Sequence, residues 1–206
     1  MPLRKSLAVS LAGAFLLSVA GAALAADTPS HDPRVKFKDG ERFVRDLADG
    51  LSLPRDQICK ELGKYDCNDQ AFKIVLGGVE PYDMRILDPL ENASLAAPIA
   101  VDRVALHACT NRVMQDIATP ASAVLFKAPA GAAAARAPNK AWMDATTATI
   151  YDRVLRRPAT NAEKAQMADF YKTVSAGRSD PVAAVEKDWV TLSCFAVASS
   201  LENTFY

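Results

Sequence analysis

Residues 98–118, PIAVDRVALHACTNRVMQDIA, contain the clearest helical pattern in the chain. Pro98 stands in the first turn, where a helix accepts proline, and Pro120 follows the last apolar residue. Between the two prolines, apolar side chains recur at helical spacing and form one broad face: Val101, Ala105, Ala108, Cys109, Val113 and Ile117. The stretch therefore predicts a helix over 99–118 that packs in the interior.

Three further helical patterns follow toward the C-terminus. The first stops at Pro158, and the second begins at a capping-box pattern formed by Thr160 and Glu163. The third begins after Pro181 and is apolar around most of its circumference, which is typical of a helix inside a bundle. Residues 120–139 are rich in alanine and proline and predict a surface loop.

A less regular part precedes the long helix. Apolar residues at helical spacing predict a helix over 41–51, and start and stop signals predict a second, short helix over 54–62. Residues 72–79, FKIVLGGV, do not distinguish helix from strand by periodicity, and we expect an extended segment. Residues 80–98 contain prolines and acidic side chains and predict a long, packed loop with solvated acids.

These patterns predict a mainly α fold. We expect one domain over 39–206, an irregular helical bundle with a small N-terminal part of short helices and one extended segment. Residues 26–38 are polar and interrupted by prolines, and they predict a flexible leader before the domain.

Residues 1–25 have the three regions of a cleavable signal peptide. Arg4 and Lys5 precede an apolar run that is shorter than the roughly 20 residues of a membrane-spanning helix. Residues 23–25, Ala-Leu-Ala, match the small-x-small cleavage rule. We therefore expect a periplasmic or secreted protein that begins near Ala26 and has no membrane span; a retained membrane anchor is the alternative.

The chain has four cysteines, an even number that favours pairing in an exported protein. Of the three connectivities, we favour Cys59 with Cys67 and Cys109 with Cys194. The first bridge closes a short loop, and the second joins two apolar helices. On the chain-entropy model the two bridges contribute about 2.6 and about 4.6 kcal/mol, respectively. Buried free thiols are the alternative.

The charge balance excludes a strongly basic class of protein. The chain has 24 Lys and Arg and 24 Asp and Glu, and removal of the predicted signal peptide leaves an excess of two acidic residues. Such a chain has no electrostatic reason to bind nucleic acid or an anionic membrane.

Motifs for the common chemistries are absent from the sequence. With only two histidines, His31 and His107, a multi-histidine zinc site cannot form, and a serine or cysteine nucleophile would have His107 alone as its base in the domain. The patterns Cys-x-x-Cys-His, Gly-x-Ser-x-Gly and the phosphate-binding glycine loops do not occur. The spacing of the acidic cluster does not match an EF-hand loop: Glu80, Asp83, Asp88 and Glu91. We assign no catalytic residue, metal ligand or cofactor.

Three phrases resemble a known group of proteins. They are RFVRDLA at 42–48, YDRVLRRPATNAE at 151–163 and SCFAVASSLENTFY at 193–206. They are similar to helical domains of unknown function that lie beside c-type cytochrome modules in bacterial envelope proteins. The resemblance implies an accessory role next to another envelope protein and transfers no catalytic residue.

We therefore expect an exported, disulfide-stabilised accessory or protein-binding module of the cell envelope. Phe205 and Tyr206 at the chain's end are the candidate interface, although the two rings could instead close the core of the bundle. The alternative function is a small-ligand or non-covalent haem-binding protein that uses His107, or an enzyme whose site is not visible as a motif.

Overall fold

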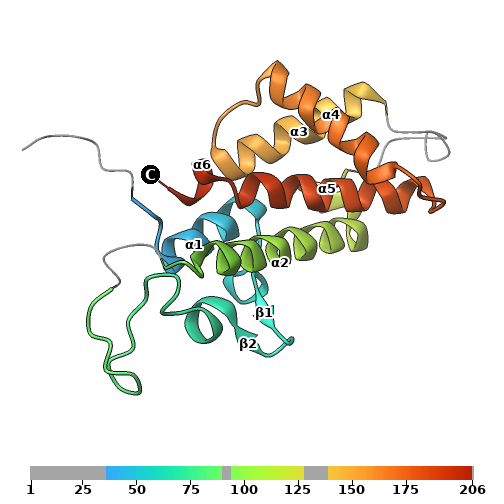
Figure 1. The fold of residues 1–206 in the computed structure, drawn as a ribbon. Coiled ribbons are helices and arrows are strands. Elements are labelled where there is room, and N and C mark those ends of the chain that lie inside the picture. The colour runs from blue at the N-terminus through green and yellow to red at the C-terminus, as the bar shows by residue number, and fades with distance from the viewer. Residues whose placement is uncertain (1–35, 90–93, 128–138, 206) are drawn as a thin grey trace, which may run out of the picture. The chain divides into compact units, whose positions relative to one another are not determined.

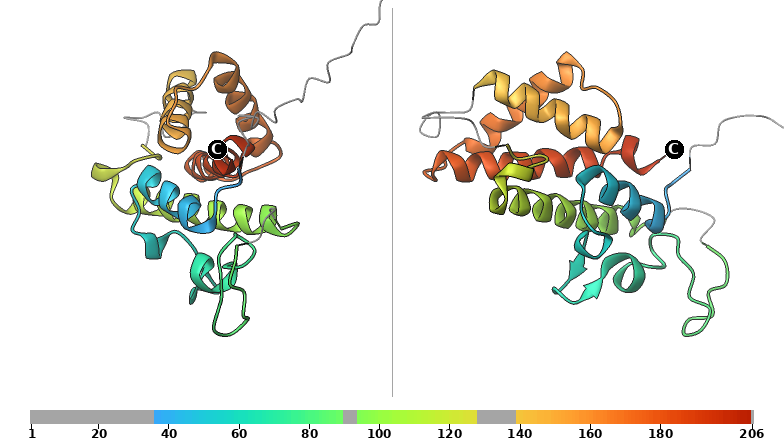
Figure 2. Two further views of the ribbon diagram at one scale, coloured as in Figure 1. Left: turned by 90° about the vertical axis from the view of Figure 1, so that its left-hand side faces the viewer. Right: turned by 180° about the vertical axis from the view of Figure 1, so that it is seen from behind.

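The helical core is organised around two long helices, α2 (Ala97–Ala118) and α5 (Val182–Ala198), which lie side by side in all three views (Figures 1 and 2). The computed structural model describes residues 36–89, 94–127 and 139–205. A disulfide between Cys109 on α2 and Cys194 on α5 joins the helices, with 5.8 Å between the two Cα atoms. Both cysteines are fully buried. The fold is mainly α, and the expectation that the last long helix is interior is confirmed.

The other elements surround this pair (Figure 1). The helices α3 and α4 form a hairpin that packs on α5, whereas α1 packs against α2 and α3. The capping box predicted before α4 is present, with reciprocal bonds between Thr160 and Glu163. In chain order, the remaining elements are α1 (Gly40–Leu51), η1 (Arg55–Gln57), β1 (Lys60–Glu61), β2 (Tyr65–Asp66), η2 (Cys67–Ala71), η3 (Pro120–Ser122), α3 (Lys140–Leu155), α4 (Asn161–Ser175) and α6 (Leu201–Thr204).

Trp189 is the largest side chain buried in the centre. Its ring centroid lies 5.4 Å from that of Trp142 on α3 and 6.0 Å from that of Tyr171 on α4. Its indole N–H donates to the Met167 carbonyl at 3.0 Å, so the polar edge of the ring is satisfied. One tryptophan on α5 thus connects the two helices of the α3–α4 hairpin.

The prediction of a second short helix over 54–62 is wrong. Only the single turn η1 is helical, and the chain then forms the antiparallel hairpin of β1 and β2. Leu62 and Gly63 at its tip both adopt left-handed backbone conformations, with φ of 53° and 70°. The disulfide between Cys59 and Cys67 closes the base of the hairpin, so the chain returns on itself where local spacing favoured continuation of a helix.

The prediction of an extended segment over 72–79 is also wrong, because residues 73–77 form turns. The Leu76 N–H donates to the Phe72 carbonyl at 2.9 Å, and the Leu76 side chain is fully buried. The Gly40 N–H donates to the Leu76 carbonyl at 2.8 Å, and a Cβ on Gly40 would lie only 2.8 Å from that of Leu76. Docking of Leu76 against the start of α1 therefore overrides the strand preference of the sequence.

The end of the predicted leader is ordered rather than flexible. Phe37 forms a β-bridge with Phe205, and the Lys38 N–H donates to the Thr204 carbonyl at 2.8 Å. Residues 1–25 and most of the leader lie outside the described residues. In the predicted loop over 120–139, the first turn is η3 and Leu125 is fully buried, while 128–138 lie outside the described residues.

Candidate functional site

His107 lies on the face of α2 that points away from α5, beside a shallow groove of roughly 630 Å³. Amide side chains from α2 and η1 line much of this groove, and they bond to one another. The Asn111 side-chain amide donates to the backbone carbonyl of Gln57 at 2.6 Å, and the Gln115 side-chain amide donates to the side-chain oxygen of Gln57. Ligand sites of drug size are mostly apolar and concave. The groove beside His107 is instead open to solvent, so its shape does not favour haem binding there.

Three potential metal-ligating side chains come close together, namely Cys59, Glu61 and Cys67. Both sulfurs belong to a disulfide, so neither is a thiolate that could ligate a metal. Glu61 is bound by Arg103 through two hydrogen bonds of 2.5 Å. In the described part of the chain no other group of this kind occurs.

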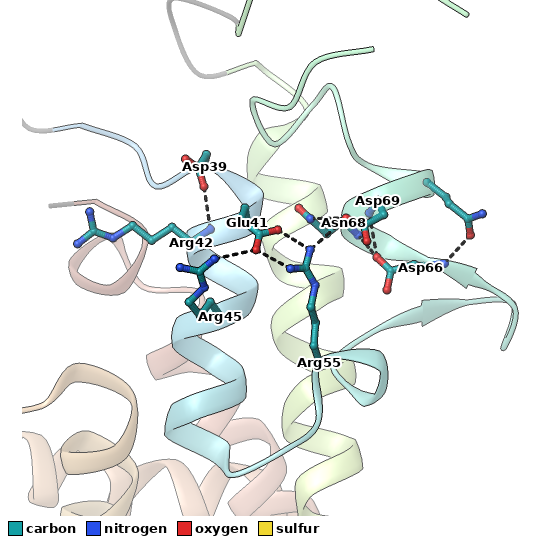
Figure 3. Close-up of polar contacts among 9 residues, drawn as sticks. Asp39, Glu41, Arg42, Arg45, Arg55, Asp66, Asn68 and Asp69 are labelled. Atoms are coloured by element: carbon teal, nitrogen blue, oxygen red, sulfur yellow. Dashed lines mark hydrogen bonds and ion pairs between the residues drawn. The ribbon is translucent and has the colours of Figure 1, made fainter. Parts of the chain in front are cut away.

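A surface ion-pair network connects α1 to the irregular N-terminal part (Figure 3). Arg55 bonds to Glu41 on α1 and, at 3.1 Å, to Asp69 on η2; Arg45 also bonds to Glu41, at 3.0 Å. The guanidinium of Arg55 lowers the pKa of Glu41 below its ordinary value. These groups are solvent-exposed, so the network orients η1 and η2 while contributing modestly to stability.

Two short segments project from the same side of α2, away from α5, as all three views show (Figures 1 and 2). We call residues 60–66, which contain β1 and β2, the hairpin prong, and residues 80–89 the loop prong. The hairpin prong is closed at its base by the Cys59–Cys67 disulfide. Two hydrogen bonds of 2.9 Å between Glu80 and Ile86 close residues 80–86 of the loop prong.

The tips of both prongs carry large apolar side chains in water. Leu62 on the hairpin prong is 89% exposed, and Tyr82 on the loop prong is 91% exposed. Met84 and Leu87 on the loop prong are exposed as well, as are Leu95, just before α2, and Ile99 in its first turn. Clusters of exposed apolar groups on a folded domain mark interaction surfaces.

The backbone of each prong includes a left-handed residue that is not glycine. Leu62 has a φ of 53°, and Arg85 has a φ of 54°. Side chains with a Cβ adopt this conformation rarely, and such local strain concentrates at functional sites. The prongs therefore combine exposed apolar tips, closed bases and strained backbone.

The candidate interface at the end of the chain has a structural role in part. Phe205 is half-buried and its ring packs edge-on against that of Phe37, with 5.5 Å between centroids, whereas Tyr206 lies outside the described residues.

The sequence did not point to the prongs, because residues 80–98 were expected to be a packed acidic loop. Tyr82 and Met84 lack the regular spacing that would have identified an exposed face.

A buried acid, Glu186 on α5, has no role in any of these surfaces. Its side chain is 2% exposed, and its Oε1 has no hydrogen-bond partner within the described residues. Burial raises the pKa of Glu186 above its ordinary value of 4.5. The folded protein therefore binds a proton at the Glu186 carboxyl more tightly than the unfolded chain does. The free energy of unfolding gained from this proton is lost as the pH rises through the folded-state pKa, because the buried carboxyl must then ionise.

Glu186→Gln should make the protein more stable in neutral and mildly alkaline solution, by about 1–3 kcal/mol, because it removes the cost of ionising a buried, unsatisfied group. The gain should shrink as the pH falls toward 4.5. Urea unfolding of both proteins across this pH range measures the difference.

Glu163→Gln provides a control of opposite sign. Arg157 and the Thr160 N–H lower the pKa of Glu163 to about 2, so its ionised form stabilises the folded protein above pH 4.5. This variant should be less stable than the wild type at neutral pH. A Glu186→Gln variant that is equally or less stable than the wild type at neutral pH would contradict the burial argument.

Comparison with models of known protein families, with curated proteins and with solved structures found no match to this chain. Among the helices that the structure describes, none has the length and apolar character to cross a membrane.

Proposed function

We propose that this protein is an exported accessory module of the cell envelope that binds another envelope protein through its two prongs. The observation that carries the proposal is the display of Leu62, Tyr82 and Met84 in water on segments closed at their bases, with Leu87 exposed directly after the second closure. Aromatic residues and methionine are enriched at the centres of protein interfaces.

Closure of the prongs makes them suited to binding. The disulfide and the Glu80–Ile86 bridge hold the tips in place before a partner arrives, and an ion pair of 2.6 Å between Lys73 and Glu80 supports the loop prong. Less conformational entropy is then lost on association, which raises affinity for a given contact area.

Placement in the envelope is supported by sequence features. Residues 1–25 have the pattern of a signal peptide, and two disulfides are compatible with an oxidising compartment. The resemblance to helical companions of envelope redox proteins also favours an accessory role. No observation favours the alternatives, haem binding or catalysis.

Site-specific photo-crosslinking in the native cell tests the docking surface. A photoreactive residue in place of Met84 should form a crosslink to one reproducible envelope protein, because Met84 is an exposed apolar side chain at a prong tip. The same residue in place of Asp169, an exposed position on α4, is the control and should not capture that protein.

Tyr82→Ser, Met84→Ser and Leu87→Ser combined should abolish a crosslink formed from position 62 and leave the melting temperature within a few degrees of the wild type, since these side chains add little to the core. A crosslink of unchanged yield in the triple variant would refute docking through the loop prong.

A further inference from the structure

The two prongs differ in charge. The hairpin prong exposes Lys60 and Lys64, and neither forms an ion pair within the described part of the chain. Its two acids are half-buried: Glu61 is paired with Arg103, and Asp66 accepts the backbone N–H groups of Asn68 and Asp69, so the exposed, unpaired charges of this prong are positive. The loop prong exposes Asp83 and Asp88 with Arg85 between them, so it carries an excess of negative charge. Each prong also presents apolar groups at its tip. One prong is therefore complementary to the other, in charge and in apolar character.

A single molecule cannot satisfy this complementarity by itself, because its prongs point in the same direction with η2 between them (Figure 1). A second copy related by a two-fold axis can satisfy it. In such an arrangement residue i contacts j and j contacts i, so the hairpin prong of each molecule lies against the loop prong of the other. Both contacts then pair lysines with aspartates and bury apolar tips.

We propose that the free protein is a symmetric dimer in which the hairpin prong of each copy packs against the loop prong of the other. The inference rests on the proposed function in that it uses the same surface. It adds regulation, because a dimer covers the prongs until an envelope partner displaces the second copy. A closed two-fold contact also protects exposed apolar groups from open-ended association.

Charge reversal gives a test with a built-in rescue. One variant carries Lys60→Glu and Lys64→Glu, and the other carries Asp83→Lys and Asp88→Lys. Each variant alone juxtaposes like charges at both contacts of the dimer, so its self-association should weaken by about tenfold or more. In a mixed dimer, the acidic hairpin prong of the first variant lies against the basic loop prong of the second. The basic hairpin prong of the second variant lies against the acidic loop prong of the first, so both contacts are attractive.

The first variant has two acidic prongs and the second has two basic prongs. In an equimolar mixture, only the mixed dimer therefore has two attractive contacts. We therefore expect sedimentation equilibrium of the mature chain at micromolar to sub-millimolar concentration to show a wild-type dimer, two monomeric variants and a mixed dimer. Far-UV circular dichroism and melting temperature should match the wild type, because all four positions are exposed. The wild-type dissociation constant should also rise with ionic strength.

A monomeric wild type, a variant that stays dimeric alone, or a mixture that stays monomeric would overturn the proposed dimer. The crosslinker in place of Met84 separates the two proposals. A monomeric wild type that still crosslinks to an envelope protein removes the dimer and retains the proposed function. A monomer that crosslinks to nothing removes both, and a crosslink between two copies in the purified protein supports the dimer.

Discussion

Asp116→Ala should reduce the free energy of unfolding by about 3–5 kcal/mol, the range for removal of one member of a buried ion pair. Asp116 on α2 is fully buried, pairs with Arg112 at 2.8 Å and accepts three backbone hydrogen bonds. The donors are the N–H groups of Val124, Leu125 and Phe126, at 2.7–2.9 Å. Alanine leaves these groups and the guanidinium buried without their partner.

Asp169→Ala is the matched control, since Asp169 is also a helical aspartate with a basic partner but is largely exposed. Its ion pair with Lys172 contributes little, and this variant should lose no more than about 0.5 kcal/mol. Urea unfolding followed by circular dichroism measures both variants. Equal losses in the two would show that Asp116 does not anchor the chain after α2.

Replacement of Cys109 and Cys194 together by alanine should cost about 4.6 kcal/mol on the chain-entropy model, because this bridge joins residues 85 apart in the chain. The bridge connects α2 and α5 at the centre of the bundle, and both side chains are fully buried. The loss is comparable to the whole stability of many domains, so the variant should be largely unfolded at moderate urea concentration.

The Cys59→Ala and Cys67→Ala double variant is the comparison. Its bridge closes a separation of only 8 residues, so the loss should be about 2.6 kcal/mol and should leave the helical bundle folded. Non-reducing mass spectrometry verifies that the remaining disulfide is intact in each variant. A larger loss from the hairpin bridge than from the bridge between helices would contradict the chain-entropy argument.

Helices with their own start and stop signals were predictable. Pro98, Thr160 and Pro181 stand at or beside the starts of α2, α4 and α5, and the structure places the helices there. The cysteine pairing favoured from the sequence is the pairing in the structure. Cys109 and Cys194 lie on the buried faces of α2 and α5, and packing of these helices brings the two sulfurs together.

The candidate site was not predictable in the same way. The hairpin prong replaces part of an expected helix because a disulfide and two left-handed residues turn the chain at Leu62 and Gly63. The exposure of Tyr82 depends on the bridge between Glu80 and Ile86, which has no periodic pattern. The burial of Glu186 was not predictable either, since nothing in its neighbours along the chain distinguishes a buried glutamate from a solvated one.

The sequence by itself determined the helical class, the order of the long helices and the capping box of α4. These features depend on spacing and on side chain to backbone bonds within three or four residues, which are local. Only the tertiary structure decided that Phe37 pairs with Phe205, that Asp116 anchors the chain after α2 and that two prongs stand on one side. Those outcomes depend on which distant surfaces remain after the helices pack, because burial is a property of the whole assembly of elements.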